Sequence, residues 1–345
     1  MMNRKQFLRS ASLAAAGSLL VPTHLGATQH DEVKQVVKPP RLKIGDTLVL
    51  LATASYITEK QLEESVKNME TLGFRVKIPD DITGKNGLFS KSDAERAADV
   101  NNAFADSDVQ GIMCIRGGYG TARILPLLDY QMIASHPKVV LGYSDVTALH
   151  YALYKEASLV SFHGPVATST FNPYSVANMQ ATVMSDTLPA PFVNAADAEV
   201  PLTVITPGSA SGFLVGGNLS VMVSLIGTRF DVPTSGALIY IEEIGEEPYR
   251  IDRMLTQMIQ AGKFTNAAGV LCGVFRNCES KVNSDIDSRV TLADILKDRL
   301  EPLGIPVLYG FSFGHIVNKV TLPFGISAEM NTEQGTLRLL EPAVV

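Results

Sequence analysis

The chain carries, at Pro137-Lys-Val-Val-Leu-Gly-Tyr-Ser-Asp-Val-Thr-Ala-Leu-His150, the pattern of a buried strand, a sharp turn and a helix. Residues 139–141 form an apolar run too short for a helix, which Gly142 ends, and they predict the strand. Residues 145–154 place apolar side chains at helical spacing. Ser144 therefore lies on the turn, above the carboxyl edge of a sheet and beside the first N–H groups of a helix. That is the geometry of a nucleophile elbow.

Ser144 also fits a second interpretation, in which it is only the N-cap of the helix. A serine in that position commonly accepts a hydrogen bond from the first turn, and Asp145 would complement the positive end of the helix dipole. The elbow pattern G-x-S-x-G is incomplete, because Val146 stands where the second glycine would be. The local sequence leaves both interpretations open.

The composition is that of a folded protein. With 345 residues, 46% hydrophobic and 19% charged, the chain is long enough for two domains and is unlike a disordered one. Its formal charge of −6 argues against nucleic acid or an anionic membrane as a partner. We expect no metal site and no cofactor. The three cysteines predict no obligatory disulfide, although a Cys272–Cys278 or Cys114–Cys272 bridge stays open.

Residues 1–27 have the pattern of a secretory signal peptide. A basic segment at residues 3–9 precedes a small-residue apolar segment and a cleavage site near residue 27. The order Arg-Lys-x-Phe-Leu resembles a twin-arginine leader with one arginine replaced by lysine. Residues 28–40 are polar, end in two prolines and predict a tether, and no later stretch is apolar enough to span a bilayer. We expect an exported protein, periplasmic or extracellular.

Strand and helix patterns alternate in the first half of the chain. The strand patterns lie at residues 45–52, 74–78 and 111–115, and the helix patterns at residues 58–72 and 92–104. This alternation predicts a doubly wound parallel sheet in a domain of residues 41–170. Residues 171–200, rich in Ser, Thr, Asn, Pro and Ala, predict a connection. Residues 201–345, with short strand patterns and three helix patterns, predict a smaller mixed α/β domain.

A glycine-rich loop, Arg116-Gly-Gly-Tyr-Gly120, follows one of these strand patterns. It should therefore lie at the carboxyl edge of the sheet, where such sheets bind ligands. The loop has neither the spacing of a dinucleotide fingerprint nor the lysine of a P-loop, so phosphate binding is not predicted. Its glycines either form only a tight turn or let the backbone approach a substrate and donate an N–H to an oxyanion.

Two histidines are candidate general bases for Ser144. His163 and His315 each stand beside a glycine at the end of an apolar strand pattern. His150 follows Ser144 by six residues and would point away from it around the helix axis. A single histidine at a strand end is also often only a structural hydrogen-bonding residue. The residues alone do not separate His163 from His315.

Two adjacent carboxylates are candidate acids. The apolar strand pattern at residues 237–241 runs into Glu242 and Glu243, which a period of two places on opposite faces of the strand. An apolar strand that ends in carboxylates must reach solvent or a functional site. The charged turn at residues 246–253 follows, and capping with surface ion pairs is its alternative explanation.

Six groups of motifs follow one another along the chain. They are Arg116-Gly-Gly-Tyr-Gly120, Leu141-Gly-Tyr-Ser-Asp145, Phe162-His-Gly-Pro165, Gly216-Gly-Asn-Leu219, Ile241-Glu-Glu243 with Tyr249-Arg-Ile-Asp-Arg253, and Phe313-Gly-His315 with Leu322-Pro-Phe-Gly325. Their set and order resemble the LD-carboxypeptidases, a family of serine peptidases, over about residues 40–340. The resemblance implies a flavodoxin-like N-terminal domain, a smaller C-terminal domain and a Ser-His-Glu triad divided between them.

The same resemblance implies roles for single residues. Ser144 becomes the nucleophile, His315 the general base and Glu242 the orienting acid. Glu243 is the alternative acid, and His163 becomes a structural residue near the cleft. Hydrolysis by such a triad also requires donors for the oxyanion and contacts to the substrate. The expected donors are the N–H of Asp145 and that of Gly117 or Gly118, and the expected substrate contacts are Arg116, Glu246 and Arg250.

The resemblance implies a serine carboxypeptidase that hydrolyses an L,D-peptide bond. Its expected substrate is a peptidoglycan-derived tetrapeptide, from which it would release D-Ala during cell-wall turnover. The alternatives are a hydrolase of microcin-C-like aminoacyl nucleotides, another serine hydrolase such as an esterase, and an exported solute-binding protein without catalysis. The nucleotide-directed relatives often use a tryptophan platform, and this chain contains no Trp. The family also implies a homodimer.

Overall fold

The computed structural model describes residues 35–280 and 290–345. The expected signal peptide at residues 1–27 and most of the expected tether lie outside the described residues. Within the described part of the chain, no helix combines the length and the apolar character needed to cross a membrane. The described residues belong to one compact unit, Gln35–Val345, and the domain boundaries near residues 170 and 200 stay a prediction.

The first sheet has six strands in the order β11-β5-β4-β3-β1-β2. Its strands are β1 (Thr47–Leu51), β2 (Arg75–Lys77), β3 (Gly111–Cys114), β4 (Val139–Gly142), β5 (Ser161–His163) and β11 (Leu322–Phe324). The first five pair in parallel. Strands β3 and β4 are buried along their whole length, as parallel strands covered on both faces should be. The predicted parallel α/β sheet is confirmed.

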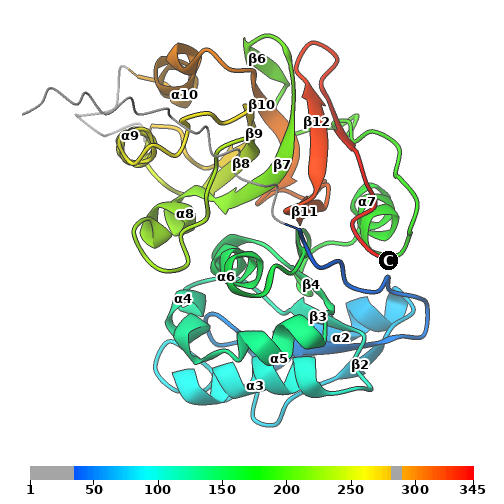
Figure 1. Ribbon diagram of the computed structural model, residues 1–345. Helices are drawn as coiled ribbons and strands as arrows, with labels where there is room; N and C mark the ends of the chain where they lie inside the picture. Colours follow the sequence, from blue (N-terminus) through cyan, green and yellow to red (C-terminus); the bar gives the residue numbers. More distant parts are fainter. Residues whose placement is uncertain (1–34, 281–289) are drawn as a thin grey trace, which may run out of the picture. The chain divides into compact units, whose positions relative to one another are not determined.

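Helices connect the strands of this sheet. They are α2 (Glu59–Thr71), α3 (Asp93–Ala105), α4 (Thr121–Ile124), α5 (Tyr130–Ser135), α6 (Thr147–Ala157) and α7 (Pro173–Val183), with 3-10 turns η1 (Leu125–Leu127) and η2 (Ser144–Val146). Helix α5 contacts both α3 and α6, whereas α2 packs against β2 (Figure 1). Helix α3 begins with a capping box in which Ser92 and Glu95 satisfy each other's backbone N–H groups.

The second sheet has seven strands in the order β13-β12-β7-β8-β9-β10-β6. They are β6 (Thr203–Thr206), β7 (Ser209–Asn218), β8 (Ala237–Ile244), β9 (Gly269–Arg276), β10 (Val307–Gly314), β12 (Ser327–Asn331) and β13 (Thr336–Leu339). Strands β7 to β10 are parallel and the outer three are antiparallel. The associated helices are α8 (Leu219–Leu225), α9 (Pro248–Gln260), α10 (Leu292–Leu300) and the 3-10 turn η3 (Glu301–Leu303). The mixed character predicted for this half is confirmed.

Strand β11 joins the two halves of the chain. It follows the second sheet's β10 in sequence, yet it pairs antiparallel with β5 at the edge of the first sheet, with Leu322 opposite His163. Helix α6 contacts both β5 of the first sheet and β7 and α8 of the second (Figure 1). The loop between β10 and β11 is therefore held against the carboxyl edge of the first sheet. The sequence patterns did not predict this strand.

The three cysteines are buried free thiols, so neither of the two disulfides considered above is present. Burial raises the pKa of the Cys114 thiol to about 12, which keeps it protonated and unreactive at neutral pH.

Candidate active site

Ser144 stands on a sharp turn between β4 and α6. Its φ of +65° lies in the left-handed region, which non-glycine residues occupy rarely and mostly at functional sites. A Cβ on Gly142 would lie 2.9 Å from a methyl group of Val146, so glycine allows the chain to turn this tightly. The N-cap positions of η2 and α6 belong to Tyr143 and Val146. The N-cap interpretation of Ser144 is therefore wrong, and its hydroxyl is free for another partner.

That partner is His315, which follows β10. The Nε2 of His315 lies 3.0 Å from Ser144 Oγ, and its Nδ1 lies 2.7 Å from Oε2 of Glu242 on β8. Glu242 is completely buried. A Cβ on Gly314 would lie 2.8 Å from the Glu242 carboxylate, so the glycine lets the chain pass close to it. Two successive hydrogen bonds thus connect the Ser144 hydroxyl, the His315 imidazole and the buried Glu242 carboxylate.

Glu243 lies on the opposite face of β8 and has different partners. Its carboxylate accepts hydrogen bonds from Asn218 Nδ2 at 3.0 Å and from the backbone N–H of Ser220 at 2.8 Å and of Ile244 at 2.9 Å. Burial raises the pKa of the Glu243 carboxyl, and these donors oppose the shift. Glu242 is thus the carboxylate that contacts the imidazole, and Glu243 anchors the start of α8.

The other candidate base, His163, and His150 on α6 are both buried, and neither hydrogen-bonds to Ser144. His150 bonds Ser161 Oγ at 2.8 Å and the carbonyl of Gly142 at 2.9 Å, and burial lowers its pKa to about 4. His163 lies among aromatic rings, and neither ring nitrogen has a hydrogen-bond partner among the described residues. Burial holds the pKa of His163 well below its usual value. Both imidazoles are neutral core groups at neutral pH.

The glycine-rich loop lies against the elbow. A Cβ on Gly117 would lie 2.7 Å from Ser144 Cβ and 3.3 Å from the backbone N of Asp145, so only glycine fits there. Gly118 has φ +129°, and a Cβ on it would collide with Ser55. The Asp145 carboxylate accepts a hydrogen bond at 2.7 Å from the N–H of Thr121, just after the loop. The glycine-rich loop thus packs against the nucleophile, and the role of its N–H groups as oxyanion donors stays a prediction.

Of the three expected substrate contacts, only Arg116 lies beside Ser144. Arg116 is partly buried and donates from Nε to the carbonyl of Gly117 at 3.1 Å, beside Ser144. Glu246 and Arg250 form an ion pair of 3.5 Å with each other, and Arg250 also donates to the Tyr249 hydroxyl. In residues 35–280 and 290–345, no hydrogen bond or ion pair joins either of them to the triad. The ion pair matches the alternative explanation of a surface ion-paired turn, although the N-cap residue of α9, Glu247, makes no side-chain capping hydrogen bond.

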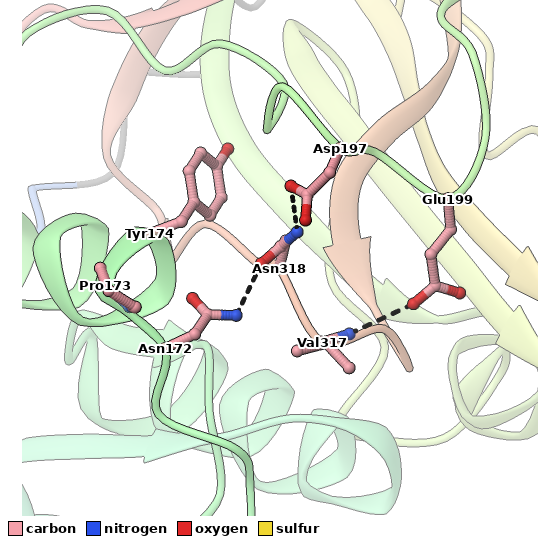
Figure 2. Close-up of a pocket in the computed structure, with 7 residues that line it drawn as sticks. All are labelled: Asn172, Pro173, Tyr174, Asp197, Glu199, Val317 and Asn318. Carbon is pink, nitrogen blue, oxygen red and sulfur yellow. Dashed lines mark hydrogen bonds between the residues drawn. The ribbon is translucent and has the colours of Figure 1, made fainter.

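A cavity of about 650 Å³ opens beside the loop that follows His315. Its walls are Asn172, Pro173, Tyr174, Asp197, Glu199, Val317 and Asn318. Figure 2 shows the amide of Asn318 between Asn172, at 2.6 Å, and the Asp197 carboxylate, at 2.7 Å. The Glu199 carboxylate accepts the N–H of Val317 at 3.4 Å. Asp197 and Glu199 belong to residues 171–200, which the sequence analysis interpreted only as a connection. The sequence analysis therefore did not identify these two acidic groups near the triad.

The chain matches the LD-carboxypeptidase N-terminal domain over residues 48–164 and the LD-carboxypeptidase C-terminal domain over residues 211–330. The chain belongs to the LD-carboxypeptidase family. A probable murein peptide carboxypeptidase of Bacillus subtilis is 38% identical over 299 residues, which are 87% of this chain and 93% of that protein. The microcin C7 self-immunity protein of Escherichia coli is 24% identical over 87% of this chain and 94% of its own.

A solved member of the family has the same fold. The crystal structure of muramoyltetrapeptide carboxypeptidase from Oxalobacter formigenes superposes with a TM-score of 0.73 at 30% identity, over 85% of this chain and 97% of that one. Membership in the family and these relatives support a carboxypeptidase function for the chain.

Two cations and a tyrosine beside the Ser144–His315–Glu242 triad were not predicted from the sequence. The Tyr143 ring lies edge-on to His315 at 4.8 Å between centroids, and Lys319 Nζ lies 4.8 Å from the Tyr143 ring centroid. Burial lowers the pKa of Lys319 to about 8, with the Glu242 charge opposing the shift. Arg276 donates from Nη1 to the His315 carbonyl at 2.8 Å. The only sequence signal was a lysine inside the apolar run that leads into β11.

Proposed function

We propose that this protein is a serine LD-carboxypeptidase that releases D-Ala from murein tetrapeptides. The single observation that carries the proposal is the continuous line of hydrogen bonds from Ser144 Oγ through His315 to Glu242. A serine hydroxyl is a weak nucleophile unless a base accepts its proton, and an imidazole is held in one tautomer by an acid on its other nitrogen. The line supplies both partners.

The proposed reaction begins when Ser144 Oγ attacks the scissile carbonyl. His315 Nε2 accepts the hydroxyl proton and later donates it to the leaving amine, which is D-Ala. Glu242 accepts the Nδ1–H of His315 and stabilises the imidazolium that forms. Water then attacks the acyl-enzyme, with His315 as base again, and restores the serine.

The tetrahedral intermediate carries an oxyanion that needs donors in place. A Cβ on Gly117 would lie 2.7 Å from Ser144 Cβ and 3.3 Å from the backbone N of Asp145, so the loop backbone borders the nucleophile. We assign the oxyanion to the N–H of Asp145 and that of Gly117 or Gly118. A single donor of this kind typically contributes about 3 kcal/mol to the transition state.

The proposed substrate carries a negative carboxylate on one side of the scissile bond and a positive ammonium group on the other. The terminal carboxylate of D-Ala would be held by Arg116 and Arg276, since Arg116 borders Gly117 and Arg276 borders His315. The diamino acid before D-Ala carries an ammonium group on its side chain. We assign that group to the cavity next to His315, where the carboxylates of Asp197 and Glu199 can receive it.

The substrate proposal is tested with synthetic tetrapeptide and pentapeptide stems. The tetrapeptide's scissile carbonyl belongs to an L-centre, whereas the pentapeptide's belongs to a D-residue whose side chain would lie on the wrong side of the nucleophile. We expect free D-Ala from the tetrapeptide, little from the pentapeptide, and none from either with Ser144→Ala. Preferential cleavage of the pentapeptide would overturn the substrate assignment.

A second candidate function is hydrolysis of an aminoacyl nucleotide analogue, since the microcin C7 self-immunity protein is a relative. The specific observation in its favour is Tyr174, whose ring lines the cavity and could stack on a base (Figure 2). The absence of Trp from the chain favours the peptide. Incubation with an aminoacyl sulfamoyl adenosine separates the two, because turnover of this compound above the tetrapeptide rate would favour the nucleotide.

We further propose that the enzyme is exported and acts as a homodimer. Export would place it next to the cell wall and its peptides, and the basic and apolar pattern of residues 1–27 supports it. Cell fractionation tests the location, and a cytoplasmic, uncleaved chain would contradict it. Light scattering tests the oligomeric state, for which a monomeric mass is the contrary result.

A further inference from the structure

Arg96 on α3 is among the largest fully buried side chains of the described residues, with 1% of its surface exposed. A buried guanidinium costs free energy unless its donors are used, so such residues are rare without a specific partner. Arg96 lies outside the triad and outside the cavity. Its partners therefore indicate what its burial achieves.

The guanidinium connects two loops at the carboxyl edge of the first sheet. Its Nη1 donates to the carbonyl of Thr53, after β1, and to the carbonyl of Gly120 at 3.3 Å, after β3. Its Nη2 donates to Asp93 at 2.7 Å. The guanidinium also lies over the Phe89 ring, 4.2 Å from the centroid. One of these contacts, to the Gly120 carbonyl, is to the glycine-rich loop itself.

Gly120 is the last residue of that loop, and the Phe89 ring packs against it on the side of Arg96. Its φ is +111°, and a Cβ there would overlap the Phe89 ring that Arg96 covers. At the near end, Gly117 lies against Ser144. Just beyond Gly120, Thr121 donates its N–H to Asp145. The loop that carries the second oxyanion donor is therefore held between Arg96 on one side and the nucleophile elbow on the other.

We propose that Arg96 is a positioning residue that holds residues 116–120 so that an N–H of this loop faces the oxyanion. The inference rests on the proposed serine mechanism. Arg96 acts through the carbonyl of Gly120 and does not reach the substrate. The loop contains three glycines and is intrinsically flexible, so an external anchor is what keeps its N–H groups preorganised for a charge that exists only in the transition state.

The chain offers a matched control in Arg123. Its guanidinium pairs with the same Asp93 carboxylate, at 2.8 Å, and lies over the same Phe89 ring, 5.0 Å from the centroid. Arg123 is half exposed, and its guanidinium bonds Asp93 and also interacts with the side chain of Tyr119 in the loop. Among the described residues it makes no hydrogen bond to a backbone carbonyl of the loop, whereas Arg96 does. Arg123→Met therefore removes the shared ion pair, the shared ring contact and a contact to the Tyr119 side chain. Arg96→Met removes the ion pair, the ring contact and the hydrogen bond to the loop backbone at Gly120.

The kinetic test compares kcat and KM for D-Ala release from the tetrapeptide. We expect Arg96→Met to lower kcat by about tenfold or more, a fraction of the loss of a whole oxyanion donor, with KM changed by less than about threefold. Arg123→Met should stay within about threefold of wild type in both. Arg96→Lys keeps one cationic donor and should recover part of kcat, and it replaces Arg96→Met if that variant does not fold. Equal kcat values for the Arg96 and Arg123 variants would overturn the inference.

A second measurement does not depend on turnover. We expect amide hydrogen exchange of residues 116–120 to be faster in the Arg96 variant than in Arg123→Met, while exchange in β4 stays unchanged. If wild-type protein releases no D-Ala, the proposed function fails, and exchange alone still decides whether Arg96 anchors the loop. Unchanged exchange in the loop would refute the anchor.

Discussion

His315 Nε2 lies 3.0 Å from Ser144 Oγ although 171 residues separate them in the chain. The contact depends on β11, which follows His315 and pairs with β5 in the same sheet that supports Ser144. Residues 315–321 thus cross from one sheet to the other and place the imidazole above the elbow.

Ser144 and His315 should act as a unit, because the hydroxyl is unreactive without its base. Ser144→Ala and His315→Ala should each lower kcat for D-Ala release by about 10⁴-fold or more, and the double variant should be hardly worse than either. Thermal unfolding should show that all three remain folded. Additive losses in the double variant would contradict the assignment.

His163 supplies the control for the identity of the base. His163→Phe replaces a buried neutral imidazole whose nitrogens are without partners among the described residues by a ring of similar shape. We expect activity within about tenfold of wild type and no loss of stability, since no hydrogen bond is removed. A His163 variant less active than His315→Ala would transfer the role of base to His163.

Glu242 and Glu243 should respond oppositely to the same substitution. Glu242→Gln keeps the shape and removes the charge that holds the His315 tautomer, so kcat should fall by about 10³- to 10⁴-fold with the protein folded. Glu243→Gln weakens contacts to Asn218 and Ser220, so it should cost about 1–3 kcal/mol of unfolding free energy and little activity. Urea unfolding together with kcat measures both, and the reverse pattern would identify Glu243 as the acid.

Gly117→Ala should strongly reduce kcat without unfolding the protein. The new Cβ would lie 2.7 Å from Ser144 Cβ, so either the loop or the nucleophile must move, and we expect kcat to fall at least about 10²-fold. Gly87→Ala is the control, because Gly87 has φ +65° and open space around it. It should cost about 1 kcal/mol of stability through backbone strain and leave kcat unchanged. A Gly117→Ala enzyme with normal kcat would exclude this loop from the oxyanion site.

Lys319 should make stability depend on pH above 8. Burial lowers its pKa from 10.5 to about 8, with Glu242 and Glu199 opposing the shift and Arg276 adding to it. Between pH 8 and 10.5 the unfolded chain binds more protons at this site than the folded chain, so this residue's contribution to the free energy of unfolding rises with pH. The cost of burying the ammonium is fully present below pH 8, on the order of 3 kcal/mol.

The measurement is urea unfolding of wild type and Lys319→Met from pH 7 to 10.5. The stability advantage of the variant should be largest below pH 8 and should shrink towards pH 10.5. Lys138→Met is the comparison, because Lys138 is also buried but donates to the carbonyl of Ala103. That variant should be less stable than wild type at pH 7, since it leaves this buried carbonyl without its donor. A difference between wild type and Lys319→Met that is constant with pH would show that the ammonium is not desolvated.

The sequence by itself determined the local elements that carry chemistry. The apolar run at residues 139–141, the glycine after it and the helical spacing beyond specified the turn that exposes Ser144, because each depends on neighbouring residues only. The same reasoning placed the loop at residues 116–120 at the carboxyl edge of a parallel sheet. The set of candidate partners was also readable, since buried strands rarely end in histidine or paired carboxylates without a reason.

Only the tertiary structure decided which of those candidates meet. Alternation along β8 puts Glu242 and Glu243 on opposite faces, but which face meets His315 depends on the register of β8 with β7 and β9. The choice of His315 over His163 depends on the pairing of β11 with β5, a contact between distant segments that no local pattern encodes. Arg96 and Lys319 look like ordinary surface cations in the sequence, because burial is a property of the packed chain. Long-range pairing is set by the sum of packing interactions over both sheets, and the active site forms where that packing brings the ends of β4, β8 and β10 together.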